Sequence, residues 1–273
     1  MEFPQIDPVI FQIYGPIGLN WYGLTYLAGF AGAWLLGTYR AKKPNSPFTP
    51  EQISDFLFYA FLGVIIGGRV GYVLFYNFGL FINDPMYLFK IYDGGMSFHG
   101  GLLGVLASFW YFARKTGKTF ATISDYFAPM APIGLATGRI GNFINGELWG
   151  KPTDVESVPW AMIFPSAPGG LESGVYRHPS QLYEFALEGV VLFIILYYFS
   201  KKPRPALSVS GLFLLGYGAF RFIVEYWREP DDHLRAMAEY ISMGQLLSLP
   251  MVFAGIAMIV WGYKYSPVKQ QTK

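Results

Sequence analysis

The chain of 273 residues is 53% hydrophobic and 19% aromatic, but only 14% of its residues are charged, against about 25% in an average soluble domain. This balance predicts a membrane protein. The formal net charge of +2 gives no bulk electrostatic reason to bind nucleic acid. The absence of cysteine excludes a disulfide framework, a thiolate metal site and a cysteine nucleophile within the chain.

The first ten residues, "MEFPQIDPVI", contain acidic residues but no lysine or arginine. A cleavable signal peptide begins with a basic region, so we expect the chain to enter the membrane through its first spanning helix.

Apolar stretches follow along the chain, each near the roughly 20 residues that a spanning helix needs. They are Ile17–Tyr39, Phe56–Tyr76, Gly95–Ala113, Ala121–Gly138, Leu182–Phe199, Ala206–Val224 and Tyr240–Tyr263. The fourth contains Asp125, Pro129 and Pro132, so we expect it to be broken or partly re-entrant. The predicted fold class is all-α: a polytopic membrane protein with about seven transmembrane helices, forming a single integral membrane domain over residues 1–273.

Basic residues follow every second stretch and set the expected orientation. They are Arg40, Lys42 and Lys43, then Arg114, Lys115 and Lys118, then Lys201, Lys202 and Arg204, then Lys264, Lys269 and Lys273. By the positive-inside rule these connections face the cytoplasm. The amino terminus is then outside and the carboxyl terminus inside, and the longest connection, residues 139–181, forms a small outer lobe.

Glycines spaced four residues apart predict close helix packing. Gly63, Gly67 and Gly71 follow this spacing, as do Gly100 and Gly104, and small residues at such positions let spanning helices approach closely. We also expect the glycines beside His99 to leave room for a ligand to approach its ring.

Charged residues within spans are costly and mark candidate functional sites. The predicted direction of each span brings several of them to the outer half of the membrane: Arg69, His99, Arg139, Arg221 and Glu225, with Glu147 just beyond. Arginine presents a planar fork that suits phosphate, so we expect a site for a phosphate-bearing lipid headgroup. The neutral side chains of Asn142, Asn145 and Tyr22 suit further hydrogen bonds there.

Structural alternatives stay open for these residues. Arg221 and Glu225 are four residues apart and also suit a simple ion pair. Arg69 suits neutralisation of a carboxylate, and His99 suits a packed position. Asp125 and Glu188 each stand alone within their predicted span, which favours structural roles. The absence of H-E-x-x-H, G-x-S-x-G and Walker-type motifs argues against a metal hydrolase, a serine hydrolase and an ATP-driven pump.

The stretch "GRIGNFINGELWG", residues 138–150, resembles the signature G-R-x-G-N-F-x-N-x-E-x-x-G of the prolipoprotein diacylglyceryl transferases, with every fixed position present. The stretches "NWYGLTYLAGF", "DGGMSFHGGLLG", "RHPSQLYE" and "GYGAFRFIVEYWREPD" are also similar to the family. The resemblance therefore covers nearly the whole chain, apart from Thr153–Tyr176.

The resemblance implies an enzyme of the bacterial inner (cytoplasmic) membrane, with a periplasmic amino terminus and lobe and a cytoplasmic carboxyl terminus. It implies transfer of a diacylglyceryl group from phosphatidylglycerol to the lipobox cysteine thiol of a prolipoprotein. The product is a thioether, and glycerol phosphate leaves. No cofactor and no metal are implied, because the phosphate ester already activates the donor.

The resemblance also implies roles for single residues. His99, Arg139 and Arg221 are the expected catalytic residues; Arg139, Asn142, Glu147, Tyr22, Glu225 and Tyr217 are the expected substrate-binding residues. The arginines would stabilise negative charge on the leaving phosphate, and His99 would take the thiol proton. Activation of the thiol by the arginines alone stays open. Glu147 and Glu225 are expected to orient the arginines.

Rival classes of function are a transporter, a phosphatidylglycerol-binding protein without chemistry, and an acyl transferase. A transporter is expected to carry charges at the midplane and internal repeats, whereas here the predicted charges gather at one side.

Overall fold

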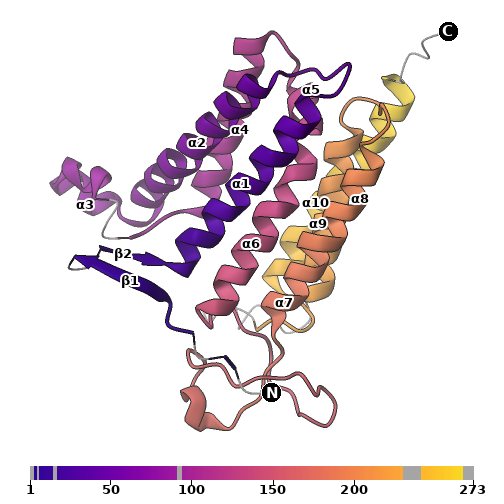
Figure 1. The fold of residues 1–273 in the computed structure, drawn as a ribbon. Helices are drawn as coiled ribbons and strands as arrows, with labels where there is room; N and C mark the ends of the chain where they lie inside the picture. The colour runs from indigo at the N-terminus through magenta and orange to yellow at the C-terminus, as the bar shows by residue number, and fades with distance from the viewer. Residues whose placement is uncertain (1–2, 5, 15–16, 91–93, 230–240, 267–273) are drawn as a thin grey trace. The chain divides into compact units, whose positions relative to one another are not determined.

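The computed structural model describes residues 3–4, 6–14, 17–90, 94–229 and 241–266, and these are mostly helical (Figure 1). This confirms the predicted helical class. The chain forms two compact units: Met1–Ala33 together with Asp125–Lys273, and Trp34–Ser124. Below, these are the first and the second unit. Helix α1 (Trp21–Ala41) contributes to both units.

The second unit is built on two long helices that run side by side (Figure 1), α2 (Pro50–Tyr76) and α4 (Phe98–Thr116). Thr49 and Gln52 form a capping box at the start of α2, and the Ser97 side chain caps α4. Between them lie α3 (Phe78–Asn83) and the 3₁₀ helix η1 (Pro85–Phe89).

Glycines close the contact between α2 and α4. A methyl group added at Gly63 or Gly67 would overlap the backbone of α4, and one added at Gly100 or Gly104 would overlap the backbone of α2. The predicted close approach is therefore confirmed. The expectation that these glycines leave room beside His99 is wrong for Gly100, because that residue faces α2.

Replacing Gly104 by alanine is expected to lower the free energy of unfolding by about 1–3 kcal/mol, the usual cost of overpacking. Thermal denaturation of the purified protein in detergent, followed by circular dichroism, measures the effect. Gly134→Ala is the matched control, because nothing lies within 4 Å of its added methyl group. Equal stability of the two variants would contradict this account of the helix contact.

The first unit holds most of the remaining helices. They are η3 (Ala128–Met130), α6 (Ala131–Ile144), α7 (Ser180–Glu184), the π-helix η5 (Phe185–Val191), α8 (Leu192–Phe199), α9 (Ser208–Val224) and α10 (Met243–Tyr265). Helix α5 (Phe120–Phe127) crosses the boundary between the units. Helices α7, η5 and α8 follow one another without a gap, so the predicted fifth span is a single helical run with a π turn in it.

Three described helical runs are long and apolar enough to cross a membrane: Pro50–Tyr76, Ser180–Phe199 and Met243–Tyr265. Ser208–Val224 is apolar but shorter. Helices α1 and α4 and the α5–α6 segment cover the other predicted spans. The expected break in the fourth span is present, because η3, with Pro129 inside it, separates α5 from α6. Tyr240, the predicted start of the last span, lies outside the described residues.

An N-terminal β-hairpin replaces the start of the first predicted span. Strands β1 (Val9–Tyr14) and β2 (Ile17–Asn20) pair in antiparallel fashion, so the prediction of an all-α chain omitted them, and α1 begins only at Trp21. The Asn20 side chain accepts a hydrogen bond from the Gly23 amide at 2.7 Å. Asparagine is a preferred residue at helix starts, and this cap ends the strand at the first turn of α1.

Asp125 has the structural role that its isolation indicated. Its carboxylate accepts hydrogen bonds from the Leu207 amide at 2.7 Å, the Ser210 amide at 2.8 Å and the Ser210 hydroxyl at 2.6 Å. These amides belong to the start of α9, where unpaired N–H groups favour an anion.

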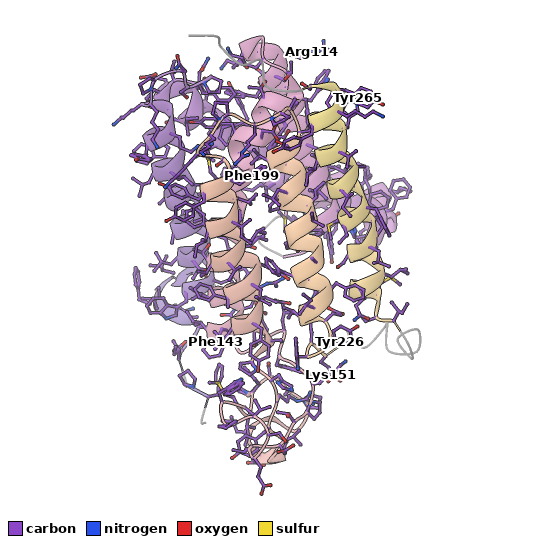
Figure 2. All side chains as sticks on the ribbon, turned by 90° about the vertical axis from the view of Figure 1, so that its right-hand side faces the viewer. Arg114, Phe143, Lys151, Phe199, Tyr226 and Tyr265 are labelled. Atoms are coloured by element: carbon purple, nitrogen blue, oxygen red, sulfur yellow. The ribbon has the colours of Figure 1, made fainter. Side chains whose placement is uncertain are left out.

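Residues between α6 and α7 form irregular backbone with one short 3₁₀ turn, η4 (Gly170–Ser173). A small apolar core lies within this irregular segment and includes a residue from the N-terminus. It contains Phe3, Met162, Phe164 and Ala167, with Phe143 and Trp149 packed against them. Figure 2 shows Phe143, Lys151 and Tyr226 at one end of the helices of this unit, and Phe199 and Tyr265 at the opposite end. Helices α6 and α9 therefore end beside this irregular segment.

Candidate active site

Helices α6, α7, η5 and α9 bring charged side chains together at the end of the first unit where Phe143 and Tyr226 lie. The arginine–carboxylate cluster, as we name it, consists of Arg139, Glu184, Glu188, Arg221, Glu225 and Arg228. Of this set, Arg139, Arg221 and Glu225 were predicted from the sequence, and the structure brings these residues together.

Glu184 is the centre of the cluster. Its side chain is fully buried, and one carboxylate oxygen lies 2.6 Å from Arg139 Nε. The other lies 3.4 Å from Arg221 Nη1 and 3.3 Å from Arg228 Nη1. One buried carboxylate thus bridges three guanidinium groups from different parts of the chain, which fixes their relative positions.

Arg221 and Glu225 form the ion pair that their spacing predicted, with Nη1 2.5 Å from Oε2. Gly244, in the first turn of α10, packs against the Glu225 carboxylate. The positive end of a helix dipole favours a carboxylate at that position. Glu225 therefore orients Arg221 and joins α9 to α10.

Glu188 lies in the cluster and is not isolated as the sequence suggested. Its side chain is fully buried, with one oxygen 3.7 Å from Arg139 Nη2. Neither carboxylate oxygen has a hydrogen-bond partner among the described residues. A charged group buried in this way costs free energy unless ion pairs stabilise it, and Arg139 is its nearest cation.

Two arginine side chains of the cluster are partly exposed, whereas its carboxylates are buried. The side chains of Arg139 and Arg221 are 17% and 15% exposed, whereas those of Glu184 and Glu188 are fully buried and that of Glu225 is 5% exposed. The side chains of these two arginines are therefore more accessible than the carboxylates that they pair with. Such a surface suits a planar, charge-assisted contact with a phosphate or carboxylate group.

A chain of hydrogen bonds extends the cluster toward the end of α6. Arg139 Nη1 donates to Asn142 Oδ1 at 3.3 Å, and Asn142 Nδ2 donates to Glu147 Oε1 at 2.8 Å. The Tyr22 side chain interacts with Asn142 and shares a 3.3 Å hydrogen bond with Tyr26. The predicted residues Asn142, Glu147 and Tyr22 are therefore neighbours of Arg139.

The start of α7 holds the loop that carries Glu147. Gln181 Nε2 donates to the Glu147 carbonyl at 2.7 Å, and Ser180 Oγ donates to the Leu148 carbonyl at 2.9 Å. Both polar side chains are fully buried. These hydrogen bonds join the stretch "RHPSQLYE" to the stretch "GRIGNFINGELWG", although the two stretches are far apart in the sequence.

Gly150 closes this loop, and a side chain there would overlap the backbone oxygens of His178 and Trp227. The Gly150 amide donates to the His178 carbonyl at 2.9 Å. Partial burial lowers the pKa of the His178 imidazole below its ordinary value. Burial therefore favours the neutral form of this imidazole.

Tyr217 lies one helical turn before Arg221 on α9. Its ring stacks on Phe213 with the ring centroids 5.9 Å apart, and the side chain interacts electrostatically with Glu188 and Arg139. The predicted residue Tyr217 therefore also borders the cluster.

Arg69 and His99 belong to the second unit. Arg69 is buried and donates to the backbone carbonyls of Tyr87 at 2.6 Å, Leu88 at 3.1 Å and Gly94 at 2.6 Å. Its guanidinium holds the connection between α3 and α4, which supports the structural alternative left open for Arg69, with backbone carbonyls as its partners in place of a carboxylate. His99 is exposed in the first turn of α4, directly beside the Phe98 ring. Its part in the site stays a prediction.

Sequence reasoning missed Glu184 and Arg228. A signal was present for Glu184, which precedes Glu188 by four residues, a spacing that places both side chains on one helical face. Arg228 lies beyond the end of α9, so helical spacing gave no signal for it. Among the described residues there is no group of three or more histidine, aspartate or glutamate side chains placed to hold a metal ion.

Apolar helices able to cross a bilayer, with partly exposed arginines paired to buried carboxylates at one end of the first unit, indicate a polytopic membrane protein. The family model of the prolipoprotein diacylglyceryl transferases matches residues 8–261. The chain therefore belongs to the prolipoprotein diacylglyceryl transferase family.

Several relatives bear the name phosphatidylglycerol–prolipoprotein diacylglyceryl transferase. The protein from Vibrio atlanticus is 60% identical over 100% of this chain and 98% of its own length. The protein from Aliivibrio salmonicida is 60% identical over 97% of this chain and 90% of its own length. The protein from Vibrio cholerae is 61% identical over 97% of this chain and 94% of its own length.

Proposed function

We propose that this chain transfers the diacylglyceryl group of phosphatidylglycerol to a cysteine thiol of prolipoproteins, in the bacterial inner membrane. The thiolate attacks the glyceryl carbon next to the phosphate, a carbon–sulfur bond forms, and the carbon–oxygen bond to phosphate breaks. The products are a thioether and glycerol phosphate, and the thiol proton passes to a base.

The observation that carries this proposal is the exposure of Arg139 and Arg221 over buried carboxylates. In the transition state, negative charge grows on the phosphate oxygen that leaves. Guanidinium groups already fixed by Glu184 and Glu225 stabilise that charge without reorganising. Asn142, Glu147, Tyr22 and Tyr217 border the same surface and contact the lipid donor.

Charge at the opposite end of the first unit supports an outer site. Lys201, Lys202 and Arg204 follow the end of α8, and Lys264 lies at the end of α10. Phe199 and Tyr265 mark this end in Figure 2, away from Phe143 and the irregular segment. By the positive-inside rule this basic end is cytoplasmic, and the cluster and the lobe of residues 139–181 face the periplasm. Lys269 and Lys273 lie outside the described residues.

The test uses purified protein in detergent with phosphatidylglycerol and a lipobox peptide, and a Cys→Ser peptide as control. Peptide mass and release of glycerol phosphate are recorded together. A diacylglyceryl mass gain on the cysteine peptide alone, with matched release, is expected. An acyl mass gain would identify an acyl transferase instead. Lipid binding without any mass gain would overturn the enzymatic proposal in favour of a lipid-binding protein.

His99→Gln is expected to lower the rate by about 10²–10⁴-fold if His99 takes the thiol proton. A free thiol has a pKa near 8.5, so raising the pH supplies thiolate without a base. The deficit of the variant, measured as kcat/KM from pH 6 to pH 9, is therefore expected to shrink as the pH rises. A deficit that is the same at every pH would contradict the role as a base.

A further inference from the structure

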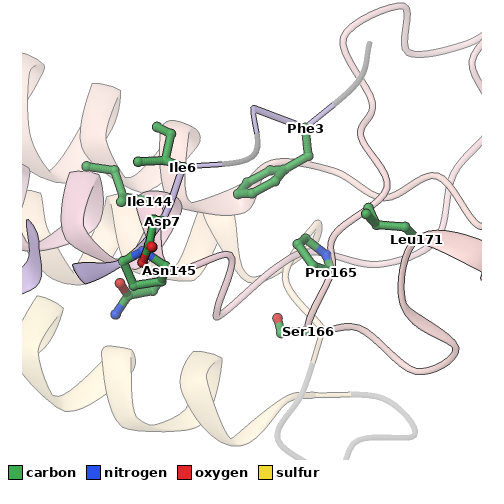
Figure 3. A pocket seen from close by; sticks show the side chains of 9 residues that line it. Phe3, Ile6, Asp7, Ile144, Asn145, Pro165, Ser166 and Leu171 are labelled. Carbon is green, nitrogen blue, oxygen red and sulfur yellow. The ribbon is translucent and has the colours of Figure 1, made fainter. Parts of the chain in front are cut away.

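A cavity lies at the end of α6, where Ile144 and Asn145 are among its lining residues. It has a volume of about 630 Å³ and is surrounded by the N-terminal segment, the end of α6 and the irregular segment that follows it (Figure 3). It is lined by Phe3, Ile6, Asp7, Pro8, Ile144, Asn145, Pro165, Ser166 and Leu171. This volume is in the usual range for ligand sites, about 300–1,000 Å³.

The lining residues offer no positive charge to an anionic ligand. No lysine or arginine is among the described residues that line the cavity. The polar side chains among the lining residues are those of Asp7, Asn145 and Ser166 (Figure 3). Asn145 Oδ1 has no hydrogen-bond partner among the described residues. A phosphate group would be repelled here, whereas an N–H donor would satisfy an acceptor that is otherwise unpaired.

The cavity is next to the proposed reaction centre. Asn145 follows Asn142 by three residues, about one helical turn, and Asn142 accepts a hydrogen bond from Arg139 at 3.3 Å. The acceptor in the proposed reaction is a polypeptide, so its chain continues on both sides of the reacting cysteine. The segment before the cysteine is the apolar part of a signal peptide and suits the bilayer. The segment after it leaves on the side of the lobe.

We propose that this cavity binds the residues of the acceptor polypeptide that directly follow the modified cysteine. The Asn145 amide and the Asp7 carboxylate accept N–H groups of that segment. Phe3, Ile6 and Leu171 pack against its side chains. Asn145 Oδ1 is buried in this structure, and because the terminal torsion of an asparagine side chain is broad, rotation of the amide brings Oδ1 to the peptide when it binds. This inference rests on the proposed transfer to a polypeptide thiol.

The test compares two lipobox peptides, one that ends at the cysteine as an amide and one that continues for several residues. Transfer from phosphatidylglycerol is measured as kcat/KM for each. Asn145→Leu removes the acceptor, and Leu171→Trp fills the cavity from the opposite wall. Val155→Trp is the matched control, because Val155 is also exposed in the irregular segment but is not among the lining residues.

Each of the two cavity variants is expected to lower kcat/KM for the long peptide about tenfold, the effect of roughly one lost hydrogen bond or packing contact. The short peptide should react as fast with these variants as with the wild-type protein. Equal losses for both peptides would overturn the inference and assign Asn145 to the donor site. If the wild-type protein modifies neither peptide, the proposed reaction itself fails, and the inference fails with it.

Discussion

Replacing Arg139 by lysine is expected to lower kcat/KM for diacylglyceryl transfer about 10²–10³-fold, the usual cost of losing one donor that stabilises developing charge. Arg139 contacts Glu184 through Nε at 2.6 Å and Asn142 through Nη1 at 3.3 Å. A lysine ammonium is a compact charge and cannot make both contacts while it also presents a planar edge to phosphate. Steady-state kinetics with phosphatidylglycerol and a lipobox peptide measures the loss.

Arg204→Lys is the control for this prediction. Arg204 follows α8 at the end of the unit away from the cluster, and its Nε donates to the Phe199 carbonyl at 2.8 Å. We expect kcat/KM of this variant to stay at the wild-type value. Wild-type kinetics in Arg139→Lys would show that charge alone, without the guanidinium geometry, is enough at this position, and the proposed contact with phosphate would be wrong.

Glu184→Ala is expected to lower the free energy of unfolding by about 3–5 kcal/mol, the cost of breaking a buried ion pair by removing one partner. The substitution leaves three arginines with two glutamates in the cluster, since only Glu188 and Glu225 remain. Thermal denaturation in detergent measures the change. Asp55→Asn is the control: Asp55 pairs with Lys115 at 3.0 Å, but their side chains are 50% and 41% exposed. Breaking such a surface pair costs about 1 kcal/mol or less.

The excess positive charge of Glu184→Ala gives this prediction a second readout. A phosphate-bearing lipid that binds the folded protein stabilises it by mass action. Added phosphatidylglycerol should therefore raise the Tm of Glu184→Ala more than that of the wild-type protein. Two results together would contradict the central role of Glu184. Glu184→Ala would be as stable as Asp55→Asn, and phosphatidylglycerol would raise its Tm no more than that of the wild-type protein.

Parts of the fold followed from local chemistry. The glycine spacing in α2 and α4 is a local pattern, and the structure has the close helix contact that it predicted. The N-terminal hairpin was missed because Ile17–Leu19 is apolar and continues directly into the residues of α1. Apolar periodicity over so few residues does not distinguish a strand from the start of a helix.

The candidate site was predicted only in part, and single residues show why. Arg139, Asn142 and Glu147 are close in sequence, and so are Arg221 and Glu225, so their contacts follow from helix geometry. Arg69 looked the same as these arginines in the sequence, because a buried arginine that binds loop carbonyls has the same hydrophobic neighbours as one that binds a ligand. Its partners, the carbonyls of Tyr87 and Leu88, are fixed only when the chain folds.

The sequence by itself determined the class of this protein, its apolar helical runs and the family to which it belongs, because composition, segment length and a long motif are local properties. Only the tertiary structure decided that Glu184 bridges Arg139, Arg221 and Arg228, and that Asn145 borders a cavity free of basic residues among its described walls. The physical reason is that ion pairs and cavities depend on which helical faces meet. Packing across long sequence separations sets that choice, and residue spacing does not encode it.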